Sequence, residues 1–70
     1  MYPQQSRLLD YLKNRQGGAS TLEIIRETDI LRPANRVQEL RELGFKIVTN
    51  WTFEHTGKGL HRVAKYVLLH

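Results

Sequence analysis

The sequence predicts an α+β protein in which three helices are followed by a long β-hairpin. Apolar residues recur at helical spacing up to position 43 and then alternate with polar residues from position 47 onward. Gly44 stands where the period changes, and the segment "HTGKG" divides the alternating part into two strands. At 70 residues the chain is expected to form a single domain spanning 1–70.

The first two helices are predicted from their end signals. Residues 4–15 place apolar side chains at helical spacing, and the glycine pair at 17–18 ends the pattern. The segment "STLE" follows, with Ser20 as N-cap and Glu23 three residues later. This pair is a capping box, which predicts a second, short helix over about 21–28.

The third helix is predicted from Pro33, which suits a first helical turn, to Leu43. Gly44 then supplies the left-handed position that ends many helices. About three residues join the second and third helices, a connection typical of a helix-turn-helix.

The hairpin register follows from its turn. Gly57 and Lys58 are expected to be the central turn residues, because glycine first in a two-residue loop fits a primed turn. This register gathers the large apolar groups on one face by pairing Ile47 with Leu68, Thr49 with Tyr66 and Trp51 with Ala64. Trp51 is expected to pack where the hairpin meets the helices. The other face carries three valines that we expect to meet a partner subunit or a short third strand: Val48, Val63 and Val67.

The positive charge lies in the second half of the chain. The net charge is +4, and residues 1–31 hold four basic and four acidic groups, whereas residues 32–70 hold seven basic and three acidic groups. Such asymmetry favours a polyanionic partner, although a solvated basic face is an equal alternative on charge alone.

With these elements in place, the chain resembles the winged helix-turn-helix domains of DNA-binding regulators. The segment "RVQELRELGFKI" (36–47) is similar to their recognition-helix pattern, and "GKG" (57–59) with "AKYVLL" (64–69) looks like their wing and final strand. The similarity extends to the N-terminal domain of the biotin repressor and to small phage and prophage proteins. Asp29 departs from the pattern, which often has glycine there, but Asp tolerates the left-handed region.

The resemblance implies a recognition helix over about 32–43 that enters the major groove of double-stranded DNA. Arg can bind guanine with two hydrogen bonds, and Asn or Gln can bind adenine in the same way. A carboxylate can accept from cytosine or repel phosphate. The candidate base readers on this helix are Arg32, Asn35, Arg36, Gln38 and Glu39. Arg41 lies nearer the buried side, where its stem is expected to pack and its head to reach an acid or a carbonyl.

Further DNA contacts are expected from two other places. The hairpin tip, residues 56–62, would reach the backbone or the minor groove through Lys58, His61 and Arg62. Ser20 and Thr21, at the start of the second helix, could contact a phosphate, although simple capping also explains Ser20. A lone copy offers few contacts, so a homodimer or cooperative assembly on repeated half-sites is expected.

The function that these features favour is sequence-specific DNA binding by a transcriptional regulator or a phage or recombination accessory protein. One alternative is a protein-interaction module that uses the valine face. A weaker one is single-stranded nucleic-acid binding through Trp51 and Phe53, which requires both rings to be exposed.

The sequence offers little for other function classes. There is no cysteine, and His55 and His61 have no clustered acids near them, so neither a zinc site nor another cofactor is expected. No nucleophile–base spacing or phosphate-binding glycine loop is present, so we expect no enzyme and no small-molecule substrate. No signal peptide or membrane-spanning run is found, which predicts a cytoplasmic protein without a membrane partner.

Overall fold

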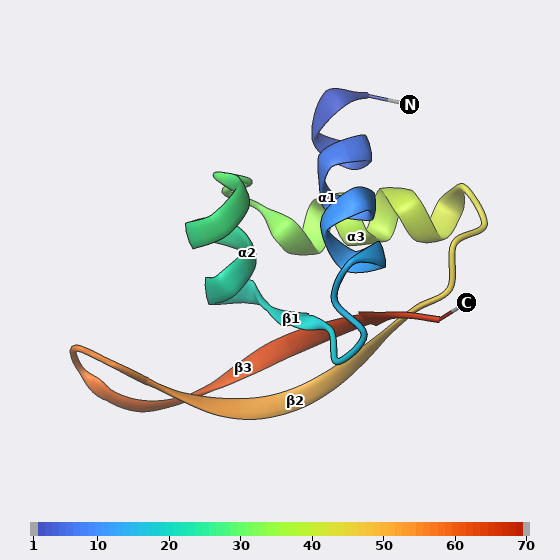
Figure 1. Cartoon of the computed structure of the whole chain (residues 1–70). Helices are drawn as coiled ribbons and strands as arrows, with labels where there is room; N and C mark the ends of the chain where they lie inside the picture. Colours follow the sequence, from blue (N-terminus) through green and yellow to red (C-terminus); the bar gives the residue numbers. More distant parts are fainter. Residues whose placement is uncertain (1, 70) are drawn as a thin grey trace.

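The computed structural model describes residues 2–69 and confirms three helices followed by an antiparallel β-hairpin (Figure 1). The helices gather on one side of a small sheet. In chain order the elements are α1 (Pro3–Lys13), β1 (Ala19–Ser20), α2 (Thr21–Thr28), α3 (Pro33–Glu42), β2 (Ile47–Thr56) and β3 (Gly59–Leu68). The first helix therefore ends two residues before the predicted Arg15.

The predicted hairpin register is confirmed, and Gly57 and Lys58 are the two central turn residues as predicted, but the predicted primed turn type is wrong. Ile47 pairs with Leu68, and the ladder runs to Thr56 opposite Gly59. A primed turn with glycine in first place needs a positive φ at Gly57. The positive φ instead falls on Gly59, at 113°, so the left-handed residue follows the turn.

A short third strand, β1, completes the sheet in the order β1-β3-β2. It pairs antiparallel with β3, placing Ala19 opposite Tyr66 and Ser20 opposite Lys65. Gly18, just before it, has φ 82° and lies so close to β3 that an added Cβ would sit 2.6 Å from Val67 Cγ2. The third strand thus joins the edge of β3 and ties the loop after α1 to the hairpin.

The helix ends follow the predicted signals. The side chain of Ser20 accepts from the Glu23 backbone N–H at 3.2 Å, and Glu23 Oε1 accepts from the Ser20 N–H, which confirms the capping box. Asp29 caps α2 with φ 60°, the left-handed conformation that Asp tolerates. At the end of α3, Gly44 has φ 102°.

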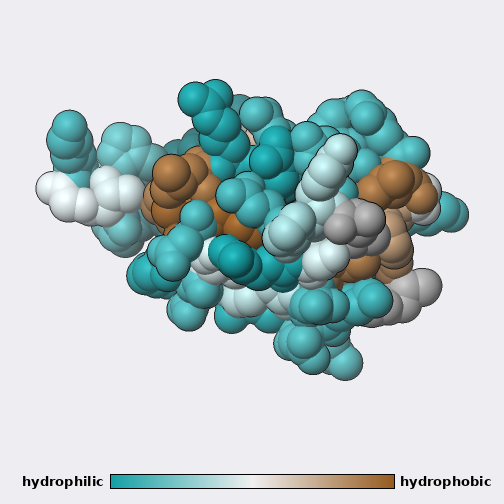
Figure 2. Space-filling view, turned by 90° about the horizontal axis from the view of Figure 1, so that it is seen from above, coloured by the Kyte–Doolittle hydropathy of each residue, from teal (hydrophilic) through white to brown (hydrophobic). Residues whose placement is uncertain are grey.

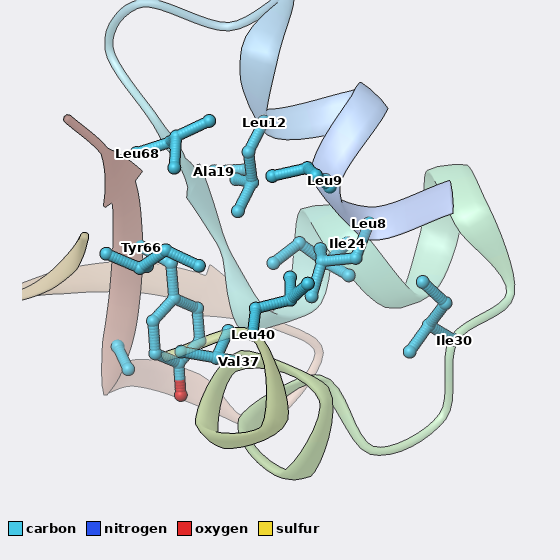
Figure 3. Packing of buried hydrophobic residues seen from close by; sticks show 12 residues of the cluster. Leu8, Leu9, Leu12, Ala19, Ile24, Ile30, Val37, Leu40, Tyr66 and Leu68 are labelled. Atoms are coloured by element: carbon cyan, nitrogen blue, oxygen red, sulfur yellow. The ribbon is translucent and has the colours of Figure 1, made fainter. Parts of the chain in front are cut away.

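One apolar core joins the helices to the sheet (Figure 3). The inner face of the hairpin contributes only from its base, where Ile47, Ala64, Tyr66 and Leu68 are buried. The helices, β1 and the connection between α2 and α3 supply the remaining members: Leu8, Leu9, Leu12, Ala19, Ile24, Ile30, Val37 and Leu40. Burial of this set provides the main driving force for folding.

The far half of the hairpin projects beyond the helices (Figure 1). Ten-residue strands are about 33 Å long, whereas a ten-residue helix is about 15 Å long. The helices therefore cover only the base of the hairpin. Trp51 lies past this cover and is 59% exposed, so the expectation that it packs against the helices is wrong.

Candidate nucleic-acid interface

The third helix presents one polar face to solvent. Pro33, Val37 and Leu40 are buried against the core. At 100° per residue, the opposite face is centred near Asn35 and Gln38, and both side chains are exposed. Arg32, the residue before the helix, is exposed as well, together with Ala34 and Glu42. The free face of α3 therefore carries two amides, with a guanidinium at its N-terminal end and the carboxylate of Glu42 at its C-terminal end.

Arg36 and Glu39 instead turn toward α1. Arg36 Nε lies 2.8 Å from Glu39 Oε1, and Arg36 Nη2 donates to Glu39 Oε2 at 2.9 Å. Gln4 accepts from Arg36 Nη1 at 3.2 Å, while Gln5 Nε2 donates to Glu39 Oε1 at 2.9 Å. These two predicted base readers therefore form an ion pair that, through its bonds to Gln4 and Gln5, links α3 to the start of α1, and they are only half exposed.

Arg41 occupies the other flank of α3. Its Nε donates to the carbonyl oxygen of Ile47 at 2.8 Å, and its Nη2 donates to Thr49 Oγ1 at 2.9 Å. The expected structural role, with the guanidinium bound to a backbone carbonyl, is confirmed. The two flanks of α3 are thus fixed to α1 and β2, which holds the amide face in place.

The N-terminus of α2 uses its polar side chains internally. Ser20 is buried, and its hydroxyl belongs to the capping box. The Thr21 hydroxyl donates to the carbonyl oxygen of Ala64 at 3.3 Å. Glu23 also forms an ion pair with Arg15. A phosphate at this helix end would therefore be met by backbone N–H groups rather than by these hydroxyls.

The hairpin tip is fully exposed, and its polar side chains lie on different faces. Lys58 lies in the turn itself. His61 pairs with Glu54 on the outer face of the hairpin, whereas Arg62 pairs with Phe53 on the inner face. The Arg62 guanidinium lies over the ring of Trp51, 4.4 Å from the ring centre. The structure thus places Lys58 and Arg62 where a long polyanion could meet both.

The valine face of the hairpin is only partly open. Val48 is 38% exposed, and Val63 and Val67 are half-buried. The largest exposed apolar groups of the hairpin lie elsewhere, on its inner face: Trp51, Phe53 and Leu60. Trp51 was expected to pack against the helices, yet both it and Phe53 are exposed. The strand length relative to the helices was the signal that could have located both rings outside the core.

Seen from the helical side, the surface is mostly hydrophilic, with two separate hydrophobic areas (Figure 2). Among residues 2–69 no three histidine, cysteine, aspartate or glutamate side chains come together to form a metal site. Within the same range, no helix has the length and apolarity required to cross a membrane.

A three-helix unit followed by an antiparallel hairpin, with a polar face on the third helix and basic residues at the projecting hairpin tip, defines a winged helix-turn-helix protein. A family-wide sequence comparison agrees: the family described as "Winged helix-turn-helix domain" matches residues 3–70. The chain belongs to this family, whose fold is a DNA-binding fold. Comparisons with curated proteins and with solved structures gave no match.

Proposed function

We propose that the protein binds specific sequences in double-stranded DNA, as a transcriptional regulator or as a phage or recombination accessory protein. The observation that carries the proposal is the free amide face of α3, formed by Asn35 and Gln38 and held between two anchored flanks. An α-helix fits the major groove, where an amide side chain can both donate to and accept from adenine. These two residues are the leading base readers.

Arg32 joins them as a reader of guanine near the N-terminal end of the helix. Arg36 and Glu39 hold each other and α1, so their first contribution is to orient α3. They can reach bases only if this pair opens.

The wing and α2 supply contacts to the DNA backbone in this proposal. Lys58 and Arg62 neutralise phosphates, His61 adds a polar contact from the outer face, and the hairpin tip follows the backbone or the minor groove. Ser20 and Thr21 mark the N-terminus of α2, where backbone N–H groups can bind a phosphate.

A single copy would read only a few base pairs with one short helix. We therefore include in the proposal a homodimer or cooperative binding to repeated half-sites, whose spacing would follow the helical repeat of DNA. The stoichiometry of the complex with a selected site measures this directly.

The experiment is selection of binding sites from a random duplex library, performed with the wild type and with the double variant Asn35→Ala/Gln38→Ala. A good two-hydrogen-bond contact discriminates by about 1–3 kcal/mol, so the double variant should lose at least about ten-fold in affinity for the wild-type site. Gln16→Ala, which removes an exposed amide from the loop after α1, is the matched control and should bind normally. Equal affinity of the double variant and the wild type would contradict the proposal.

A further inference from the structure

The inner face of the projecting part of the wing forms an exposed aromatic surface, which we call the wing platform. It consists of Trp51, Phe53, Leu60 and Arg62. Trp51 is 59%, Phe53 64% and Leu60 57% exposed. Cross-strand pairing places Phe53 directly opposite Arg62, and Trp51 diagonal to it, on the same face. Exposing three large apolar groups together on a small protein indicates a binding surface.

The charge on this face is positive. Arg62 lies on the Trp51 ring, and in the hairpin ladder the inner-face positions carry no acidic residue. The single carboxylate of the hairpin, Glu54, projects from the outer face. Lys58 stands at the adjoining tip. A cationic surface with aromatic rings and no acid complements a polyanion that has flat apolar groups, which is the chemistry of a nucleic-acid strand.

The arrangement of the rings selects unpaired bases over a duplex. In a duplex the faces of the bases are covered by their neighbours, and only the base edges reach the grooves. Trp51 and Phe53 are two residues apart on one strand, about 7 Å along it. Stacked bases rise by about 3.4 Å, so one base can lie on each ring only if the strand is unstacked.

We propose that the wing platform binds unpaired DNA bases next to the duplex, stacking them on Phe53 and on the Trp51 ring, while Arg62 moves off that ring to meet the phosphates together with Lys58. The preferred ligand is then a junction between duplex and single strand. The duplex part of this inference rests on the proposed function of α3, whereas the platform itself does not.

Trp51 is the only tryptophan in the chain, so its emission reports directly from the platform. The probes are a short oligothymidine strand, a blunt duplex, and the same duplex with an oligothymidine overhang. Oligothymidine and the overhang should quench the emission in a saturable manner. Phe53→Ala keeps the reporter and should weaken oligothymidine binding about ten-fold. Val48→Ala, which truncates an exposed side chain on the other face of the same strand, is the matched control and should bind as the wild type does.

The outcomes separate the two proposals. If Phe53→Ala and Trp51→Ala bind the oligothymidine and overhang probes as tightly as the wild type, measured by anisotropy, the platform inference is overturned. If oligothymidine binds but the blunt duplex does not, the platform stands and the proposed function of α3 fails. If the Trp51 emission maximum moves to shorter wavelength as the protein concentration rises without DNA, the wing platform binds a second copy of the protein. That result would overturn the inference. Because both rings are exposed, the variants should keep the wild-type fold, which circular dichroism checks.

Discussion

Replacing Gly18 with alanine should destabilise the protein strongly. The residue has φ 82°, and a left-handed conformation costs a side chain about 1–2 kcal/mol. The new Cβ would lie 2.6 Å from Val67 Cγ2 and closer still to the carbonyl oxygen of Tyr66, which belongs to the β1–β3 pairing region. Forcing a methyl group into such a site costs about 1–3 kcal/mol more. The expected loss is therefore about 2–5 kcal/mol of unfolding free energy, a large part of the roughly 4–10 kcal/mol typical of this chain length.

The neighbouring glycine is the matched control. Gly17 has no atom within 4 Å of an added Cβ and no positive φ. Gly17→Ala should therefore be neutral or should stabilise by up to about 1 kcal/mol through the unfolded state. Urea unfolding followed by circular dichroism measures both variants. A Gly18→Ala variant as stable as Gly17→Ala would refute the close approach of this loop to β3.

Three further predictions concern single side chains. Arg41→Ala should lose about 1.5–3 kcal/mol of unfolding free energy in the same urea assay, because both of its hydrogen bonds to β2 involve a charged donor; a loss under 0.5 kcal/mol would contradict this role. Ser20→Ala should cost about 0.5–2 kcal/mol by removing the cap of α2, and unchanged stability would show that the capping box contributes nothing. Burial raises the pKa of Tyr11 above its ordinary value of 10.0. The folded state thus favours the neutral phenol, and this stabilisation is present below pH 10 and is lost as the pH rises through the raised pKa. Stability measured against pH should fall less steeply there for Tyr11→Phe, and parallel curves would argue against the burial.

The elements could be predicted because their signals are local. The capping box of Ser20 and Glu23 and the glycine stop after the third helix depend on a few neighbouring residues. The hairpin register followed from the alternation of apolar residues, since slipping by one residue would move Ile47 and its partners to the wrong face. The two-residue strand β1 lacks such a pattern, because it is too short to show alternation.

The surroundings of each side chain depended on tertiary packing, and here the sequence reasoning fell short. Arg36 and Glu39 were candidate base readers by their place on the third helix, but the sequence could not show that α1 would cover this region and occupy both. Alternation likewise put Trp51 on the inner face of the hairpin without showing where the helical cover ends. The same turn residues are compatible with more than one turn type, so the sequence did not show that the positive φ would fall on Gly59 rather than on Gly57.

The central claim is that α3 and the wing bind duplex DNA. Anisotropy of a labelled random-sequence duplex at about 50 and about 200 mM salt tests it most directly, because neutralising about three phosphates makes the affinity fall by about 40-fold over this range. Lys58→Ala should bind more weakly and show a smaller salt slope, whereas Lys13→Ala, at the end of α1, should match the wild type. No binding at the lower salt concentration with tens of micromolar protein, or binding that is independent of salt, would contradict the account.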